Sequence, residues 1–168
     1  MEILFVGIAI VALMAYVSTR IKKSAADAYL RETIDAPEFA LVKPEGFLNP
    51  IDAKEGLAFY AYSKDYGVED SAKFRHSEIR IRVYESVNLK EIVKNLKSLA
   101  EKVVSEKNGN GAFLLKTENS EEKVYLEKDH KFISKNNKIY ELEFKTLQEN
   151  KEDYAERIAE TFESFKIK

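Results

Sequence analysis

Two stretches of strict alternation constrain the fold of this chain more than any other feature of its sequence. Residues 78–85, EIRIRVYE, alternate isoleucine and valine with arginine and tyrosine, and residues 138–146, KIYELEFKT, alternate apolar and charged side chains. Successive side chains of a strand point to opposite faces, so this period predicts two strands that each bury one face. The second face of residues 78–85 is expected to be solvated and basic.

Four further segments are apolar or aromatic and are bounded by turn residues, as strands are. They are residues 39–50 (FALVKPEGFLNP, broken by the turn Pro44-Glu45-Gly46), 56–63 (GLAFYAYS), 112–117 (AFLLKT) and 123–128 (KVYLEK). The last two predict a hairpin, and Asn136-Asn137 predicts the turn after it. The polar stretch 64–77 predicts a loop.

Two other stretches have helical period. From Leu89 as far as Asn108-Gly109, apolar residues fall on one stripe with lysines opposite, and Asn108-Gly109 is expected to cap the helix. Residues 149–165 stack aromatic and aliphatic side chains in the same way. The order of elements predicts an α+β domain over residues 38–168, with a mainly antiparallel sheet of about six strands packed against two amphipathic helices.

Three short motifs resemble those of the PsbP-like family. They are the Pro44-Glu45-Gly46-Phe47 turn after a strand, a strand bearing Tyr140, and a last helix that finishes at Ser164-Phe165. The resemblance implies an α/β/α sandwich around an antiparallel sheet, used for binding and assembly and not for catalysis. Its members include extrinsic photosystem II subunits, a nuclear-transport GTPase-binding protein and bacterial envelope proteins. This chain departs from the family in having Phe47 where Trp is common, and in its N-terminal segment.

That segment reads LFVGIAIVALMAYVSTRIKK and predicts a transmembrane anchor over residues 1–23. Residues 3–19 carry no charge, which is the short end of the roughly 20 residues that span a bilayer. Tyr16 suits the interface, and Arg20, Lys22 and Lys23 can reach the headgroups. A cleaved signal is disfavoured because no basic residue precedes the apolar stretch and no small-x-small site follows it. A buried core helix is the third alternative.

The flanking charges predict which side of the membrane the domain occupies. Basic residues follow the apolar stretch whereas Glu2 precedes it, so the positive-inside bias predicts a cytoplasmic domain on a single-pass anchor. The envelope proteins of the resembling family favour the extracytoplasmic side instead. Residues 24–37 are rich in helix formers and predict a helical stalk that ends at Pro37.

Composition excludes several classes of chemistry. The chain has no cysteine, so disulfides, thiolate catalysis and cysteine-zinc sites are excluded, and a net charge of −2 gives no general attraction to nucleic acid. The two histidines, His76 and His130, are expected to be surface or loop residues, because neighbouring carboxylates in a loop make a poor ligand set. We therefore expect no catalytic, cofactor-binding or metal-binding residues.

One surface is a candidate for partner or ligand binding. It combines the aromatic residues around the loop after residues 56–63 with nearby arginines: Tyr60, Tyr62, Tyr66, Phe74, Arg75, Arg80 and Arg82. Tyrosines give apolar contact area with a polar tip, as binding surfaces require. The helix lysines Lys90, Lys94 and Lys97 extend the basic set. The expected function is a non-catalytic binding or assembly module, anchored in the bilayer beside a membrane protein complex. A small-ligand-binding domain and an enzyme of unrecognised type remain as alternatives.

Overall fold

The computed structural model describes residues 13–20, 23, 26–52, 54–109 and 111–168. Its centre is a seven-stranded antiparallel sheet with the strand order β3-β4-β5-β9-β8-β7-β6. The strands are β3 Phe47–Leu48, β4 Phe59–Ser63, β5 Ser77–Glu85, β6 Lys102–Gly109, β7 Ala112–Glu121, β8 Val124–Lys135 and β9 Lys138–Leu147. A smaller antiparallel sheet has the order β1-β2-β10, with β1 Glu32–Asp35, β2 Phe39–Lys43 and β10 Lys166–Ile167.

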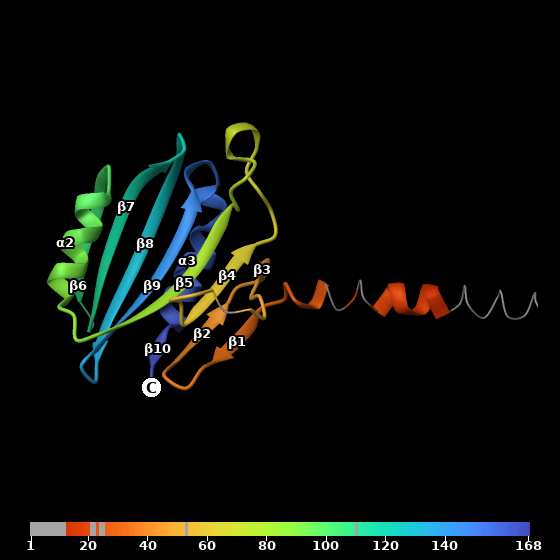
Figure 1. Ribbon diagram of the computed structural model, residues 1–168, viewed down its shortest axis with the longest axis horizontal. Coiled ribbons are helices and arrows are strands. Elements are labelled where there is room, and N and C mark those ends of the chain that lie inside the picture. The colour runs from red at the N-terminus through yellow and green to blue at the C-terminus, as the bar shows by residue number, and fades with distance from the viewer. Residues whose placement is uncertain (1–12, 21–22, 24–25, 53, 110) are drawn as a thin grey trace, which may run out of the picture.

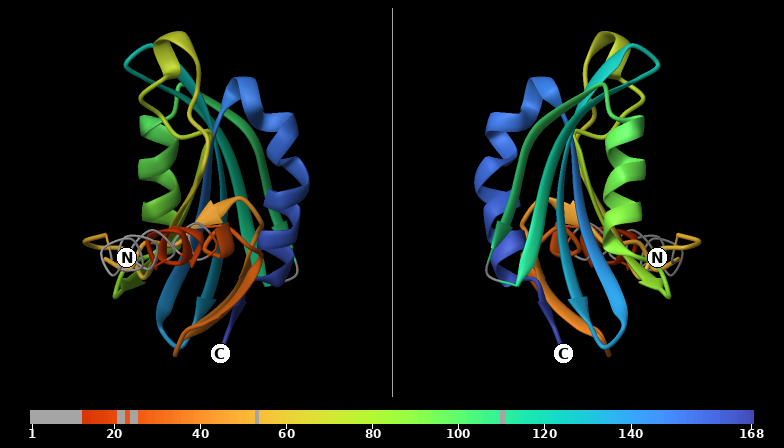
Figure 2. Two further views of the ribbon diagram at one scale, coloured as in Figure 1. Left: turned by 90° about the vertical axis from the view of Figure 1, so that its right-hand side faces the viewer. Right: turned by 90° about the vertical axis from the view of Figure 1, so that its left-hand side faces the viewer.

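Two helices lie on opposite faces of the large sheet, so the domain is an α/β/α sandwich (Figures 1 and 2). Helix α2 spans Leu89–Leu99, and the side chain of Asn88 caps it by accepting a hydrogen bond from the Lys90 amide. Helix α3 spans Lys151–Ser164 and carries two acidic residues in its first turn, which suits the positive end of the helix dipole. Two short 3₁₀ helices lie in the connections, η1 Glu69–Ser71 before β5 and η2 Gln148–Asn150 before α3.

The main core lies between the large sheet, α3 and the small sheet. Phe47 is fully buried at its centre, with ring centroids 5.5 Å from Phe144 and 5.8 Å from Tyr154 in edge-to-face contacts. A second cluster lies under α2, where Ile92 and Val93 pack over Leu115, Phe132 and Ile139. The alternation of β5 and β9 is confirmed. Ile79 and Ile81 of β5 lie in the main core with Tyr140, Leu142 and Phe144 of β9.

Tight turns join the long strands of this sheet. Glu122 and Lys123 connect β7 to β8 with φ values of 52° and 72°, and Asn136 and Asn137 connect β8 to β9 with φ values of 52° and 61°. Two consecutive left-handed residues are the mark of a type I′ hairpin turn, whose twist matches that of the strands. The turn predicted at Asn136-Asn137 is confirmed. The hairpin predicted from residues 112–117 and 123–128 is also present, but its first strand continues to Glu121, so most of the stretch 118–122 between them is strand.

Two predicted helical segments are corrected. Residues 32–35 of the expected stalk 24–37 form β1, because Ile34 pairs with Leu41 and packs against the main core. The helix expected up to Asn108-Gly109 ends at Leu99, and residues 102–109 form the edge strand β6. With these additions and β10, the fold has more strands than the six expected.

The predicted anchor over residues 3–19 lies largely outside the described residues. Its described part, residues 13–20, is helical and exposed, with Leu13 at 62% and Met14 at 67%. In the ranges that the structure describes, no helix is both long and apolar enough to cross a membrane.

Candidate functional site

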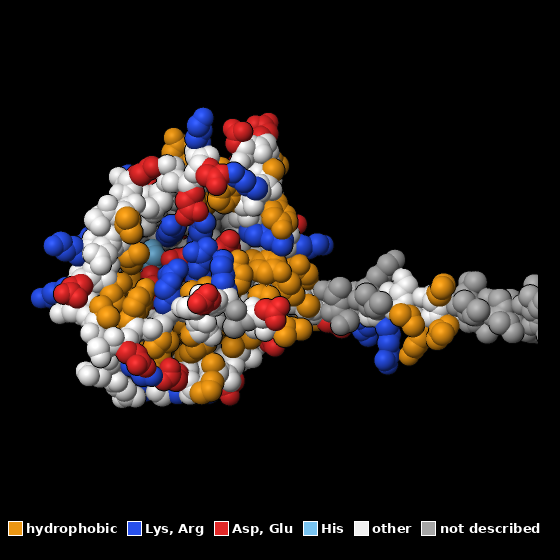
Figure 3. All heavy atoms as spheres, in the orientation of Figure 1, with side chains coloured by type: hydrophobic (Ala, Val, Ile, Leu, Met, Phe, Trp, Pro, Cys, Tyr) orange, Lys and Arg blue, Asp and Glu red, His pale blue; other side chains and the backbone are white. Residues whose placement is uncertain are grey.

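The face of the large sheet that carries α2 is covered only in part. Helix α2 packs over residues of β7, β8 and the end of β9, and the rest of this face is open. Figure 3, which looks at this face, shows basic side chains gathered near its middle with acidic ones beside them. The sheet register places on this face the outward residues Tyr60, Tyr62, Glu78, Arg80, Arg82, Tyr84, Glu141, Glu143 and Lys145.

Arginines of β5 pair with glutamates of β9 across the strands. Arg80 lies opposite Glu143, with Nη1 3.1 Å from Oε1, and Arg82 lies opposite Glu141, with Nη1 3.1 Å from Oε2. Arg82 Nη1 is also 3.0 Å from Glu143 Oε2, and Arg80 pairs with Glu78. Burial opposes the charge of both guanidinium groups, but the carboxylates outweigh it and raise their pKa values. The expected solvated basic face is therefore wrong here: these arginines are partly buried and fully paired.

His130 completes this network from β8. It is 1% exposed, and its Nδ1 lies 2.7 Å from Oε1 of the buried Glu141 carboxylate. The Tyr84 hydroxyl donates to the other oxygen of that carboxylate at 2.6 Å. The surface position expected for His130 is wrong, because β8 is an inner strand and His130 lies on its covered face. His76 is half-buried, with its ring 6.2 Å from that of Tyr154.

His130, Glu141 and Glu143 are close enough together to test as a metal site. Each offers a ligand atom within 4.8 Å of the others. The same carboxylates, however, already accept hydrogen bonds from Arg82, and two guanidinium charges beside them would repel a metal ion. His130, Glu141 and Glu143 therefore suit a buried ion network better than a metal site. This network fixes the register of β5, β8 and β9.

A stack of tyrosines and cations lies along β4 on this face. The rings of Tyr60 and Tyr62 lie 5.7 Å apart, and the Arg75 guanidinium carbon lies 4.3 Å from the Tyr62 centroid and 3.9 Å from that of Tyr66. Lys54 Nζ lies 4.5 Å from the Tyr60 centroid at the other end. We call these five residues the Tyr–Arg column. Its geometry is typical of cation–π contacts.

Hydrogen bonds hold the column in place. Arg75 Nη1 donates to the carbonyl oxygens of Lys64, at 2.8 Å, and Ser63, at 3.2 Å, so its planar group is fixed between the two rings. Burial and the nearby Glu78 carboxylate raise the pKa of Tyr60 to about 12, so its hydroxyl remains a hydrogen-bond donor at neutral pH. The column is a preformed surface with aromatic faces and polar tips.

The structure brings together most of the residues predicted for the candidate surface. Tyr60, Tyr62, Tyr66 and Arg75 form the column, and Arg80 lies directly opposite Tyr60 in the strand register. Arg82 belongs to the ion network instead. Phe74 packs against the cluster of Val124, Leu126 and Leu147, away from the column. The sequence reasoning missed Lys54, which lies in a turn, and the two glutamates of β9.

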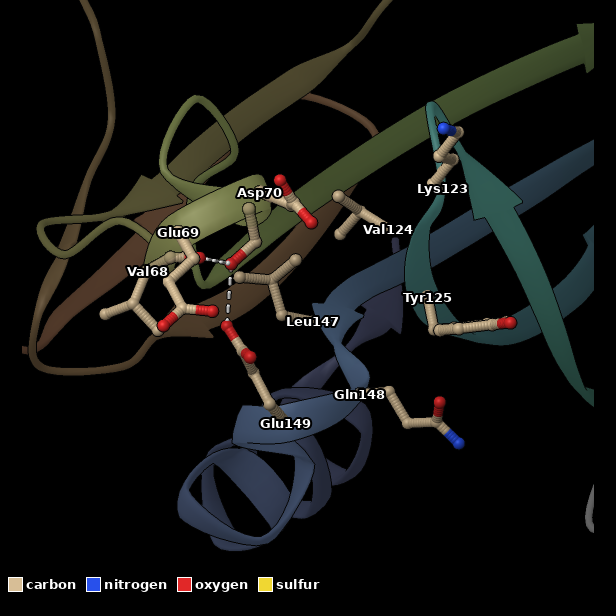
Figure 4. Close-up of a pocket in the computed structure, with 10 residues that line it drawn as sticks. Val68, Glu69, Asp70, Lys123, Val124, Tyr125, Leu147, Gln148 and Glu149 are labelled. Carbon is tan, nitrogen blue, oxygen red and sulfur yellow. Dashed lines mark hydrogen bonds between the residues drawn. The ribbon is translucent and has the colours of Figure 1, made fainter.

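A separate hollow of about 490 Å³ lies between η1, the β7–β8 turn and the start of η2 (Figure 4). Glu149 points toward η1, where its carboxylate lies 2.8 Å from the Ser71 hydroxyl, while Tyr125 and Gln148 point away. Glu69 and Asp70 add acidic groups to this lining. No histidine is among the described residues that line the hollow, so it offers Ser71 no general base of that kind.

Comparisons with known proteins identify the fold. A scan against protein-family models finds no match, and neither does a comparison with curated protein sequences. Among solved structures, LpqN of Mycobacterium tuberculosis, involved in cell envelope biogenesis, is 11% identical with a TM-score of 0.58, over 82% of this chain and 90% of that one. The Ran-binding protein Mog1p of Saccharomyces cerevisiae is 12% identical with a TM-score of 0.56, over 83% and 96%.

A third structure bears directly on the resemblance noted in the sequence. The cyanobacterial PsbP protein CyanoP of Synechocystis sp. PCC 6803 is 9% identical with a TM-score of 0.51, over 83% of this chain and 94% of that one. At such identities the likeness concerns the fold alone. The chain has a PsbP-like fold, as its short motifs predicted.

Proposed function

We propose that this protein is a non-catalytic binding module that docks a partner protein through the Tyr–Arg column. The observation that carries this proposal is the column itself, in which Arg75 is held between two tyrosine rings on an open sheet face. Tyrosine and arginine are enriched among the residues that dominate the energetics of protein interfaces. Tyrosine buries a large area with few rotatable bonds, and here the arginine is already held in place by hydrogen bonds. A preformed column loses little entropy when it binds.

The ion network on the same face supports this reading. Paired buried charges stabilise one strand register and leave no free acid or base for catalysis among Arg80, Arg82, Glu141 and Glu143. Two proteins of similar fold are consistent with a binding role: Mog1p is a Ran-binding protein, and LpqN is involved in cell envelope biogenesis.

The proposal includes a membrane anchor over residues 3–19, as the uncharged N-terminal stretch predicts. Anchoring would raise the local concentration of the domain near a membrane protein complex. The basic flank of the stretch favours the cytoplasmic side, whereas the envelope role of LpqN favours the opposite side.

Co-purification tests the docking surface. The full-length chain is isolated from gently solubilised membranes, and the partners that accompany it are compared with those of the variant Tyr60→Ala/Tyr62→Ala. We expect the variant to lose its specific partners while keeping its melting temperature. Tyr125→Ala is the matched control, because Tyr125 is 63% exposed on β8 and lies outside the column. Unchanged partners in the double variant would exclude the column as the docking surface.

Protease protection in sealed vesicles tests the anchor and its orientation. The full-length chain is expected to sediment with membranes, and its domain to be digested only when the cytoplasmic side is accessible. Digestion from the other side would place the domain outside the cytoplasm. A chain that stays in the supernatant without detergent would contradict the anchor.

A further inference from the structure

The strand β6 forms one edge of the large sheet and is exposed along its whole length. Among the described residues β7 is its one strand partner, and all of its residues from Lys102 to Gly109 are exposed. Alternate N–H and C=O groups of such a strand point outward without a strand partner, which makes the edge a template for another extended chain. A bulge between Val103 and Ser105 interrupts the first part, so the regular part of this edge runs from Ser105 to Gly109.

Apolar side chains are exposed around this same edge. Val103 and Val104 of β6 are 42% and 40% exposed, Leu114 of the neighbouring β7 is 37% exposed, and Leu99 at the end of α2 is 75% exposed. Natural edge strands are commonly protected by charges or by a covering element. Here lysines and the bulge give partial protection, and the apolar groups around them remain in contact with water.

An open hollow of about 530 Å³ lies between helix α2 and this edge. Its apolar lining comes from Leu89, Val93 and Phe113, and Glu106 and Asn108 contribute from β6 itself. The lysines of α2 form the rest of the wall. Among the described residues Lys97 pairs with Glu106, whereas no carboxylate lies within ion-pair distance of Lys90 or Lys94. The hollow therefore combines apolar walls with uncompensated positive charge.

We infer that β6 and the α2 hollow together bind an extended segment of a partner protein as an additional strand of the sheet. A strand laid along Ser105–Gly109 turns every second side chain toward the α2 side, into the hollow. Acidic side chains there meet Lys90 and Lys94, and apolar ones meet Val93 and Phe113. The partner segment is one in which acidic and apolar residues share the face that enters the hollow.

A second copy of this chain is a poorer occupant. Antiparallel pairing of two β6 strands about a twofold axis would bring two α2 helices side by side on one face. Their lysine rows, each lining its hollow, would then face one another with like charge. Charge complementarity thus favours an acidic partner segment over a β6–β6 dimer. The inference does not depend on the Tyr–Arg column, which lies at the opposite end of the sheet order.

Selection from a library of displayed random peptides, each of about ten residues, tests the inference with the full-length chain in mild detergent. We expect the selected peptides to carry acidic residues at alternate positions and to slow amide exchange in residues 105–109. The variant Lys90→Glu/Lys94→Glu should weaken a selected peptide by about tenfold or more, since two attractions become repulsions. Lys151→Glu/Lys166→Glu is the control, because both lysines are exposed on other elements.

Several results would overturn the inference. They are a selection without binders, peptides without alternate acidic residues, binding that tolerates the Lys90/Lys94 reversal, and exchange protection located elsewhere. Sedimentation of the free chain is a further check, since a monomer is expected. A dimer that dissociates in a Val104→Arg variant would assign the edge to a second copy instead.

Discussion

His130 and Glu141 form a buried pair in the middle of the large sheet, with Nδ1 2.7 Å from Oε1 and side chains only 1% and 0% exposed. The carboxylate also accepts hydrogen bonds from Arg82 and Tyr84. One glutamate of β9 thereby ties together side chains from β5 and β8. Removing such a partner leaves several donors buried without an acceptor, which costs more than the pair itself contributes.

We expect Glu141→Gln to destabilise the domain near neutral pH and to have a smaller effect in acid. Burial alone would raise the pKa of Glu141, but His130, Tyr84 and Arg82 outweigh it and lower the pKa to about 2 from the usual 4.5. The ionised carboxylate therefore stabilises the fold fully above pH 4.5, and this contribution is lost as the pH falls toward 2. The expected loss at pH 7 is about 3 kcal/mol.

Urea unfolding at a series of pH values measures this effect. Other carboxylates also titrate, including Glu121, so the quantity of interest is the difference between wild type and variant at each pH. That difference should shrink below pH 4.5. A difference that stays constant down to pH 2.5 would show that the carboxylate charge is not what stabilises the network.

A buried lysine, Lys43, ties the start of the domain to its core. Its side chain is fully buried, and Nζ donates to the carbonyl oxygens of Leu30 and Phe47, both at 2.7 Å, and of Ala28 at 3.1 Å. Burial lowers the pKa of Lys43, and Glu32 opposes that shift. The ammonium group therefore joins two parts of the chain. It binds Ala28 and Leu30, which precede β1, and it also binds Phe47, which follows the turn after β2.

Lys43→Met should lower the free energy of unfolding by about 3 kcal/mol, because three carbonyl groups lose their donor. Thermal unfolding measures the loss. Hydrogen exchange should also accelerate at the Gly46 amide, which donates to Tyr29 in this segment. Lys138→Met is the control, since Lys138 makes its ion pairs at the surface. Equal melting temperatures for the two variants would contradict the role assigned to Lys43.

Gly67 is required by close packing in the loop that carries η1. A Cβ atom there would overlap the Ser71 side chain and lie 2.8 Å from Leu147 Cδ1. We expect Gly67→Ala to destabilise the domain by about 1–3 kcal/mol through overpacking. Gly109→Ala is the matched control, because nothing lies within 4 Å of its Cβ position. Similar thermal stability of both variants would show that the loop yields to the added methyl group.

The part of the fold that local sequence determines was predictable. The alternation in residues 78–85 and 138–146 identified β5 and β9, because each strand has one face in the main core. The boundary after Leu99 was not predictable in the same way. Val103 and Val104 fit the helical stripe as well as a strand. Asn108-Gly109 suits a helix cap, but both residues belong to β6, where they pair with Phe113 and Ala112 of β7. Pairing with β7 decides between them, and pairing is a long-range property.

The prediction of a solvated basic face on residues 78–85 was wrong for the same reason, because it too depends on long-range strand pairing. Arg80 and Arg82 look like a solvated stripe until β9 is placed beside them with Glu141 and Glu143 in register. Opposite charges spaced two apart on two alternating strands are a signal of such cross-strand pairing. His130 was missed because its burial depends on β8 being an inner strand. The aromatic surface was easier to find, since Tyr60, Tyr62 and Tyr66 are close in sequence.

The last prediction concerns how Arg75 orders the loop between β4 and β5. Its guanidinium group lies between Tyr62 and Tyr66 and holds two loop carbonyl groups, so Arg75→Ala should loosen residues 64–76. Amide exchange should accelerate several-fold at Gly67 and His76, whose amides donate within this loop.

Arg75→Lys separates charge from shape at this position. An ammonium group keeps the positive charge but cannot stack as a plane between two rings, so the lysine variant should behave much like the alanine variant. Arg31→Ala is the control, because Arg31 pairs with Glu160 far along the chain and does not touch the loop. If lysine restored slow exchange, charge alone would order the loop, and the planar stacking that defines the column would not be needed for its shape.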